Sequence, residues 1–312
     1  MMRLIKRQLK RYLSPAQKTY VKTQVIKSAK LITKLPAYVA LRKMYFTQKK
    51  GIIEKFYSYN AQQLTSQLRS MGLATGDTVL LHSAFNPYNG FTDGPQKIIE
   101  CLLQVIGSTG NLLMVSMGYH GMTTHEYLRS GEKFDVRKTI SSMGIISEIF
   151  RRQPGVLRSL NPAHPMLACG SDAAWLVADH HTLLYSCGPG SPFDKALQLH
   201  AKALFFDTSL SSMTFYHYIE DRFQKSLSVP LYHEPPIEST IVDASRNELQ
   251  IKVYVFSEAS IRRRSIRKLG KALRRQGVLT IRKIGNTTLQ LVSLHDVVDC
   301  VQQKVEAGER LY

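Results

Sequence analysis

The chain has 312 residues, of which 44% are hydrophobic, and it carries a formal net charge of +19. This composition excludes a disordered chain, no apolar run approaches the roughly 20 residues that cross a bilayer, and the basic N-terminus lacks the apolar core of a signal peptide. Its four cysteines have no Cys-x-x-Cys spacing, which argues against a zinc ribbon or a disulfide framework and favours a reducing, cytoplasmic setting.

The positive charge is concentrated in two segments. Residues 1–50 hold fourteen Lys or Arg and no acidic residue, and residues 261–283 hold ten more, again with no acid. The remaining residues therefore carry a small net negative charge, which indicates a basic arm attached to a mildly acidic body. We assign residues 1–55 to a basic helical extension and residues 56–312 to the body.

Apolar residues recur at helical spacing in the arm, first before Pro15 and again before Pro36. The two sets are Met2, Ile5, Leu9 and Tyr12, and Val21, Val25, Ala29 and Ile32. Two basic amphipathic helices of this kind suit the anionic inner face of a membrane. Equally, their apolar faces could pack on the body or on a second subunit of a homodimer. Nucleic acid is the least favoured partner, because Arg and aromatic residues are not interleaved as a stacking platform requires.

The body opens with the alternation of an α/β fold. A helix around residues 64–71 precedes an apolar strand at residues 78–82, and a helix from residue 94 to about 106 precedes a second apolar run at 112–115. Strand, crossover helix and strand form the unit of a parallel sheet. We therefore expect a mostly parallel or mixed central sheet with helices on both faces, and a smaller mixed region at residues 235–291.

Polar residues and glycines follow the first strand and precede two helices of the body. Parallel sheets bind ligands beyond the carboxyl ends of their strands, and free N–H groups at a helix start suit a phosphate. We expect Ser141 or Ser142 to cap the second of these helices. The residues that form this candidate binding surface are His82, Ser83, Asp93, Gly94, Ser142, Met143 and Gly144.

Asn161 and His164 lie in a short segment that contains Pro162 and Pro165. Prolines restrict the backbone, so both polar side chains would be presented from a stiff loop. Two roles remain open for them: they hydrogen-bond the loop together, as buried polar side chains often do, or they face a ligand.

His217 and Glu220 lie in a predicted helix at residues 212–223, which follows an apolar strand at residues 203–206. Asp207, or a hydroxyl residue between 208 and 211, would cap it. Residues three apart share a helix face, so the carboxylate can orient the imidazole, which is the minimum equipment of a general base. The alternative is an ordinary solvated pair on a helix surface.

Two other features carry less functional weight. The basic segment at residues 261–275 predicts one helix with a solvated face, or else a site for acidic phosphates. His120 and His125 have no acidic partner at a metal-binding spacing, so we expect no metal.

Six motifs together resemble the aminoglycoside 3-N-acetyltransferase family. In order, they are Leu81-His82-Ser83, Asp93-Gly94, Met143-Gly144, the stretch from Pro154 to His164, Gly188 to Pro192, and Thr214 to Glu220. The resemblance runs from about Leu64 to the C-terminus. It implies acetyl-CoA as donor, bound along the candidate binding surface, and an amine of an amino sugar as acceptor. It also implies that His217 is the general base and that Glu220 orients it.

This chain departs from the family pattern at Asn161, where many members carry a histidine. Asn161 or His164 would then hydrogen-bond the substrate or the developing oxyanion. The basic arm and the scarcity of acids near the site favour an amino sugar of a surface-glycan precursor over a polycationic antibiotic. The alternative is a catalytically degenerate member of the family that binds membrane or nucleic acid.

Overall fold

The computed structural model describes residue 33 and residues 36–312, and it divides the chain into two compact units, residues 1–56 and 57–312. The described part of the first unit contains one helix, α3 (Pro36–Phe56). The two amphipathic helices predicted upstream of Pro36 lie outside the described residues. None of the helices in the described part of the chain combines the length and apolar character that a membrane-spanning helix needs.

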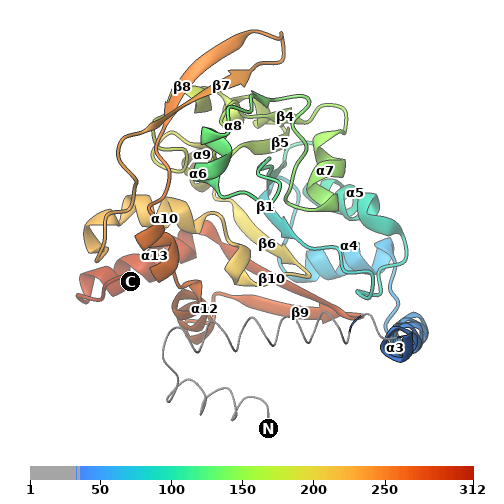
Figure 1. Cartoon of the computed structure of the whole chain (residues 1–312). Coiled ribbons are helices and arrows are strands. Elements are labelled where there is room, and N and C mark those ends of the chain that lie inside the picture. The colour runs from blue at the N-terminus through green and yellow to red at the C-terminus, as the bar shows by residue number, and fades with distance from the viewer. Residues whose placement is uncertain (1–32, 34–35) are drawn as a thin grey trace. The chain divides into compact units, whose positions relative to one another are not determined.

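The second unit is built on a seven-stranded sheet with the strand order β4-β5-β2-β1-β6-β10-β9 (Figure 1). Strand β1 pairs in parallel with β2 and β6, and the outer pairings are antiparallel. The predicted mixed α/β fold is confirmed, with its parallel part confined to the centre of the sheet. The strands are β1 (Thr78–Ser83), β2 (Asn111–Val115), β4 (Leu157–Arg158), β5 (Met166–Gly170), β6 (Lys202–Phe206), β9 (Thr280–Ile284) and β10 (Thr287–Ser293).

Alternate side chains of the central strands enter two separate hydrophobic cores, because successive residues of a strand point to opposite faces. Leu80 and Phe205 pack in one core, and Val79, Leu81 and Phe206 pack in the other. The first core is covered by α8 (Ala173–Val177), α9 (Pro192–Gln198), α10 (Tyr216–Arg222), α12 (Ile266–Arg275) and α13 (Leu294–Glu306). The second is covered by α4 (Ala61–Ser70), α5 (Gly94–Ile106) and α7 (Ile145–Arg151).

The prediction of a smaller, separate mixed region at residues 235–291 is wrong in one respect. Its first hairpin, β7 (Ile237–Val242) and β8 (Glu248–Val253), does leave the central sheet and pairs with β3 (Phe134–Asp135). Strands β9 and β10, however, extend the central sheet, and β10 lies antiparallel to β6. Leu289 enters one core of the sheet and Val292 enters the other. Burial on both faces accounts for this placement.

The basic segment at residues 261–275 forms two helices instead of the single one expected. Helix α11 (Glu258–Arg263) is followed by its C-cap residue Arg264, and α12 begins after Ser265. Along α12 the apolar positions Leu269 and Leu273 are buried, whereas the basic side chains on its other face are exposed. The remaining short elements are α6 (Thr124–Arg129) and 3-10 turns at His180–Thr182, Leu210–Ser212 and Gln224–Ser226.

Candidate active site

Helix α10 presents His217 and Glu220 to each other across one turn. Nδ1 of His217 lies 3.0 Å from Oε2 of Glu220. The Glu220 side chain is fully buried and 16% of the His217 side chain is exposed. The pair is therefore not a solvated surface contact. The helix starts later than expected: it begins at Tyr216 without a side-chain cap, and Ser209 caps the preceding 3-10 turn instead.

Two further side chains complete the hydrogen bonding of Glu220. Nε of Arg264 donates to both carboxylate oxygens, at 2.8 and 2.9 Å. The hydroxyl of Tyr312 donates to Oε1 at 2.7 Å. A buried charge costs several kcal/mol unless it is paired and hydrogen-bonded, and this carboxylate is both.

These contacts separate the charge states of the two residues. Burial lowers the pKa of His217, and the Arg264 charge lowers it further against the opposing effect of Glu220. Burial alone would raise the pKa of Glu220, but the hydrogen bonds and charges of His217 and Arg264 outweigh it, so the net pKa is lowered. At neutral pH the imidazole is neutral and the carboxylate is ionised. In this state Nδ1–H of His217 donates to Glu220, and Nε2 keeps its lone pair.

Aromatic rings enclose the imidazole. The His217 ring stacks on Phe256 with centroids 4.5 Å apart, and Phe256 stacks in turn on Tyr232 at 5.3 Å. The guanidinium of Arg264 lies over the Phe256 ring, 5.1 Å from its centroid. The Tyr232 hydroxyl donates to Asp221. Stacking on Phe256 fixes the plane of the imidazole.

His164 stands beside His217, with ring centroids 5.2 Å apart. It is buried, its Nδ1 lies 2.7 Å from Oγ of Ser186, and burial holds its pKa well below the ordinary value, with the charge of His217 adding to the effect. His164 is therefore neutral at pH 7. The structure thus brings three predicted site residues, His164, His217 and Glu220, into one cluster.

Both the oxygen and the nitrogen of the Asn161 amide bond to backbone groups. Its Oδ1 accepts the backbone N–H groups of Ala163 and His164, at 3.0 and 3.1 Å, and its Nδ2 donates to the carbonyl of His180 at 3.3 Å. The side chain has no exposed surface. Of the two roles left open by the sequence, these contacts favour the one that holds the loop together.

The residues near β1 that were predicted to bind acetyl-CoA differ from one another in burial and in their contacts. His82 is buried within the sheet and stacks on Phe205 at 4.9 Å, and burial lowers its pKa to about 3. Ser83 ends the strand. The carboxylate of Asp93 does not cap α5; it accepts the backbone N–H of Ala61 and the Thr92 hydroxyl, both at 2.8 Å. It therefore ties the start of α4 to the loop before α5.

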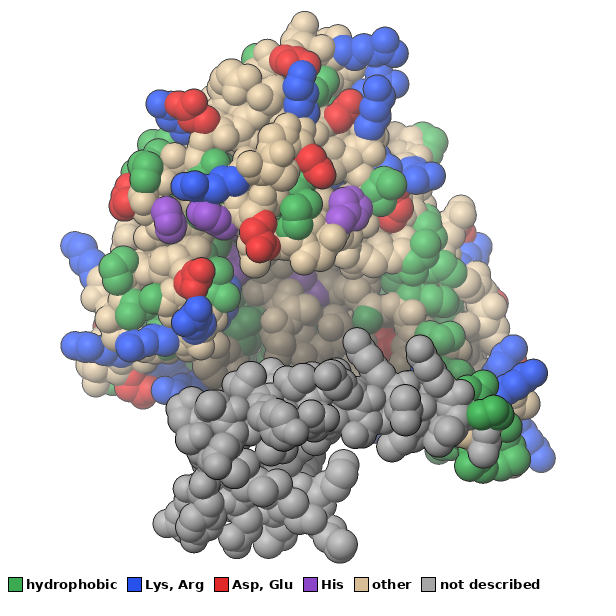
Figure 2. Space-filling view, in the orientation of Figure 1, with side chains coloured by type: hydrophobic (Ala, Val, Ile, Leu, Met, Phe, Trp, Pro, Cys, Tyr) green, Lys and Arg blue, Asp and Glu red, His purple; other side chains and the backbone are tan. Residues whose placement is uncertain are grey.

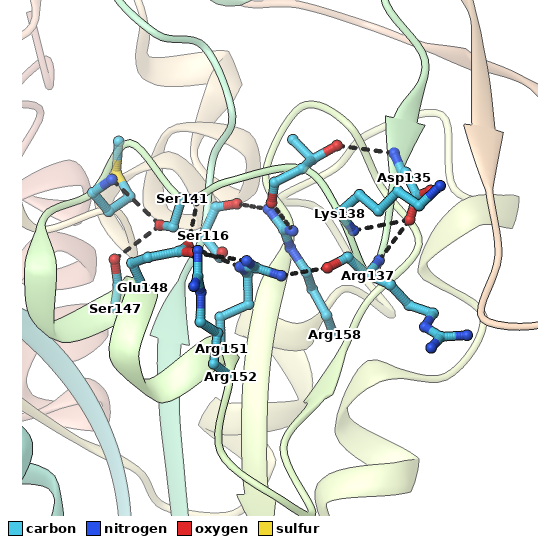
Figure 3. Close-up of polar contacts among 12 residues, drawn as sticks. Ser116, Asp135, Arg137, Lys138, Ser141, Ser147, Glu148, Arg151, Arg152 and Arg158 are labelled. Carbon is cyan, nitrogen blue, oxygen red and sulfur yellow. Dashed lines mark hydrogen bonds and ion pairs between the residues drawn. The ribbon is translucent and has the colours of Figure 1, made fainter.

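Hydrogen bonds to two other segments hold the turn formed by residues 141–144 in place. The Ser142 hydroxyl donates to the carbonyl of Met117, just beyond β2, at 2.8 Å. The backbone N–H of Ser141 donates to Glu148 at 2.8 Å, and the guanidinium of Arg151 donates two hydrogen bonds to the same carboxylate (Figure 3). Neither serine caps α7, contrary to expectation, because Gly144 occupies the cap position with φ at +108°.

The face of the body drawn in Figure 2 is hollowed in its middle, and histidine side chains line part of the hollow. In the described part of the chain, no cluster of three or more His, Cys, Asp or Glu side chains could hold a metal ion.

Residues 80–306 match the sequence model of a protein family described as aminoglycoside 3-N-acetyltransferase. The chain belongs to this family. It is 25% identical over 274 residues to the SPbeta prophage-derived aminoglycoside N(3')-acetyltransferase-like protein YokD of Bacillus subtilis (strain 168), covering 82% of this chain and 95% of that protein. The predicted resemblance is thereby confirmed.

Other proteins match a shorter part of the chain or its fold. Aminoglycoside N(3)-acetyltransferase III of Salmonella sp is 26% identical over 177 residues, which cover 52% of this chain and 60% of that enzyme. The solved structure of AAC-IIIb as a binary complex with CoASH superposes with a TM-score of 0.66 at 22% identity, over 81% of this chain and 98% of that one.

Several residues around His217 and Glu220 in this chain were not predicted from the sequence. Arg264 stood in a run of basic residues read as a solvated helix face, although Ser265, a favoured helix-capping residue, marked a break beside it. Phe256 and Tyr312 carried no such signal, since their contacts with His217 and Glu220 depend on how the C-terminal segments fold back over α10. The same holds for Tyr232, which contacts Phe256 and Asp221.

Proposed function

We propose that this chain is an N-acetyltransferase that moves the acetyl group of acetyl-CoA to an amine of an amino sugar. The observation that carries the proposal is the buried group formed by His217, Glu220 and Arg264, in which a neutral imidazole keeps one nitrogen free. Membership of the aminoglycoside 3-N-acetyltransferase family supports the reaction class, the enzymatic activity and the donor.

In the proposed reaction, Nε2 of His217 accepts a proton from the acceptor amine as the nitrogen attacks the thioester carbonyl. A C–N bond forms, the C–S bond breaks, and the imidazolium returns the proton to the departing sulfur, so the products are an amide and free CoA. The Glu220 carboxylate, held by Arg264, stabilises the imidazolium in between. His164, fixed by Ser186, would hydrogen-bond the substrate or the oxyanion.

The donor would lie along the carboxyl end of β1 at His82 and Ser83, the start of α5 at Gly94, and the turn from Ser142 to Gly144. Helix α5 has thirteen residues, so its first N–H groups and its dipole favour a phosphate. Asp93 would act through its bond to Ala61, by fixing the loop that leads into this helix.

We propose an acceptor with phosphate groups, such as an amino sugar of a surface-glycan precursor, in preference to a polycationic antibiotic. Three acids of this region are already engaged: Glu220 by Arg264, Asp221 by Tyr232, and Asp194 by the hydroxyl of Tyr218 at 2.8 Å. A polycation would need free carboxylates to replace its water.

The test is calorimetric titration of the full chain with acetyl-CoA, followed by a thiol-release assay with amino sugars, free and phosphate-linked. Saturable donor binding and release of one thiol per amide formed would support the proposal. Failure of acetyl-CoA to bind, or donor binding without transfer to any amine, would overturn it and favour the degenerate binding protein.

The arm adds a second candidate activity, peripheral attachment to an anionic membrane face. Helix α3 exposes apolar side chains, among them Leu41, Met44 and Phe56, on a segment whose charges are largely basic. Such a surface suits acidic lipid headgroups. A variant without residues 1–50 should lose binding to anionic vesicles and keep acetyl transfer. A fall in the mass of the particle in solution, with no vesicle binding by the full chain, would instead make α3 a dimer contact.

A further inference from the structure

A pocket of about 590 Å³ opens beside the edge strand β4. Four arginines line it, Arg137, Arg151, Arg152 and Arg158, and none of the described lining residues is acidic, although Glu148 contacts Arg151 and Arg152 from behind. Its apolar surface includes Leu157, which is 41% exposed. One carboxylate, that of Glu148, offsets only part of these four like charges, and the remaining charges repel one another unless a further anion binds.

Arg158 is a buried cation that lacks a carboxylate partner. Only 8% of its surface is exposed, and its guanidinium donates to backbone carbonyls, among them that of Thr139 at 2.6 Å, while Nε has no partner (Figure 3). Burial lowers its pKa to about 9, and the charge of Arg151 adds to the effect. A buried charge without a counter-ion is costly, and an anion in the pocket would supply the missing negative charge.

The other three arginines differ in how many donors they have left. Arg151 is fully committed: Nε and Nη2 donate to Glu148, and Nη1 donates to the carbonyl of Arg137. Arg152 gives Glu148 only its Nε, at 2.7 Å. Arg137 gives one amino group to the carbonyl of Ala244 at 3.4 Å. Arg137 and Arg152 are both exposed, so their remaining N–H groups are free to bind a ligand.

We propose that this pocket binds a phosphate monoester, with the phosphate held by Arg137 and Arg152 and the organic part resting on Leu157. The planar N–H fork of arginine matches phosphate oxygens in geometry and in charge. The exposed leucine would gain from covering by a nucleoside or similar group.

Two sources could supply such a group. One is a free nucleoside monophosphate or similar metabolite, and the other is the 3'-phosphate of the donor CoA, a source that rests on the proposed function. The pocket is linked to the proposed donor surface in either case, because Glu148 binds Arg152 on one side and the N–H of Ser141 on the other.

The experiment compares the full chain with Arg137→Gln/Arg152→Gln. Arg267→Gln/Lys271→Gln is the matched control, because it removes two positive charges from the exposed face of α12. Calorimetric titrations with AMP, acetyl-CoA and its 3'-dephospho form are run at one ionic strength, with thermal unfolding as a check on folding.

If the ligand is a free monoester, AMP should bind at least tenfold more weakly to the pocket variant and unchanged to the control, and saturating acetyl-CoA should not affect AMP binding. If the ligand is the 3'-phosphate of the donor, the pocket variant should lose the same tenfold in affinity for acetyl-CoA but not for its dephospho form, and AMP and acetyl-CoA should compete. The proposal is overturned if no phosphate ligand binds, or if the folded pocket variant and the control bind all three ligands alike. If acetyl-CoA does not bind at all but AMP affinity still depends on Arg137 and Arg152, the proposed function fails and the phosphate site stands.

Discussion

At the scale of single residues, Arg264 adds to the effect of burial, which keeps the candidate base neutral. Its guanidinium lies against Glu220 and over Phe256, and its charge lowers the pKa of His217 after burial has done so. A cation beside the base would prevent protonation of the imidazole before substrate arrives, and the ionised Glu220 would still stabilise the imidazolium during the reaction.

Replacement of Arg264 by Met should raise the pKa of His217, because a lowering charge is removed. Activity requires neutral His217, so it falls as pH drops through this pKa, and the acid limb of kcat/KM should move to higher pH. At pH 7 a loss of about 10- to 100-fold is expected, since a charge-assisted hydrogen bond contributes about 1.5–3 kcal/mol.

The acid limb is measured in pH–rate profiles, and NMR titration of the His217 ring gives the pKa directly. Arg267→Met, on the exposed face of α12, is the control and should leave both unchanged. An acid limb at the same pH in Arg264→Met and in the unmodified chain would mean that Arg264 is only a structural contact.

Asn161 allows a test between a scaffold role and a reacting role. Its replacement by Ala leaves two buried N–H groups, those of Ala163 and His164, without acceptors. At about 1–3 kcal/mol for each unsatisfied group, the free energy of unfolding should fall by about 2–6 kcal/mol in urea titrations. Lost turnover with unchanged stability would instead assign Asn161 to the substrate.

At the scale of elements, local signals predicted helix positions well and tertiary contacts poorly. Helix α5 runs from Gly94 to Ile106, as expected from the Asp-Gly-Pro start and the glycine after its end. The pairing of β10 with β6 and the break at Arg264 were missed. The pairing of β10 depends on which core receives its side chains, and chain-local periodicity does not contain that information. The break at Arg264 had one local signal, the helix-capping residue Ser265.

The turn from Ser141 to Gly144 should influence donor binding through its anchor on Met117. Ser142→Ala removes the hydroxyl that donates to this carbonyl. Loss of one such bond costs about 1 kcal/mol, and we expect the KM for acetyl-CoA to rise about fivefold because the turn would be less ordered.

Ser130→Ala is the matched control, because the Ser130 hydroxyl donates to a carbonyl, that of Tyr127, at 2.7 Å at the end of α6. It should leave the KM for acetyl-CoA unchanged. Equal KM values in both variants would show that the turn does not bind the donor.

At the scale of the whole molecule, buried histidines make stability dependent on pH. Burial lowers the pKa of His82 to about 3 and that of His180 to about 4, and it lowers that of His164 as well. In the unfolded chain these groups titrate near their ordinary value of about 6.5. Below that pH the unfolded state binds more protons, so the stability present above it is lost as pH falls.

Each of these histidines should contribute a slope of up to about 1.4 kcal/mol per pH unit between its folded pKa and about pH 6.5. Asp207 opposes them, because burial raises its pKa to about 6, and Asp221 and Asp296, whose pKa values burial also raises, act in the same direction as Asp207. Urea unfolding at pH 7.5, 6 and 5 measures the sum, and His180→Gln should reduce the slope. A free energy of unfolding that stays constant across this range would contradict the assignment of neutral buried imidazoles.

Net charge was informative at this scale only after it was located along the chain. The total of +19 would by itself suggest a nucleic-acid protein, whereas the mildly acidic body carries the family motifs. Sequence could predict the pair His217 and Glu220 because both lie on one helix turn. It could not predict the cluster with His164, Phe256, Arg264 and Tyr312, since these residues come from four other segments that meet only in the folded chain.

The most direct test of the central claim is the rate of thiol release from acetyl-CoA, with an accepted amino sugar, in the unmodified chain and in His217→Ala. General-base catalysis contributes about 10²- to 10⁴-fold. We therefore predict a loss of at least about 100-fold in kcat, with the Kd for acetyl-CoA changed less than twofold. Turnover that survives the substitution within a few fold would contradict the assignment of His217 as the base.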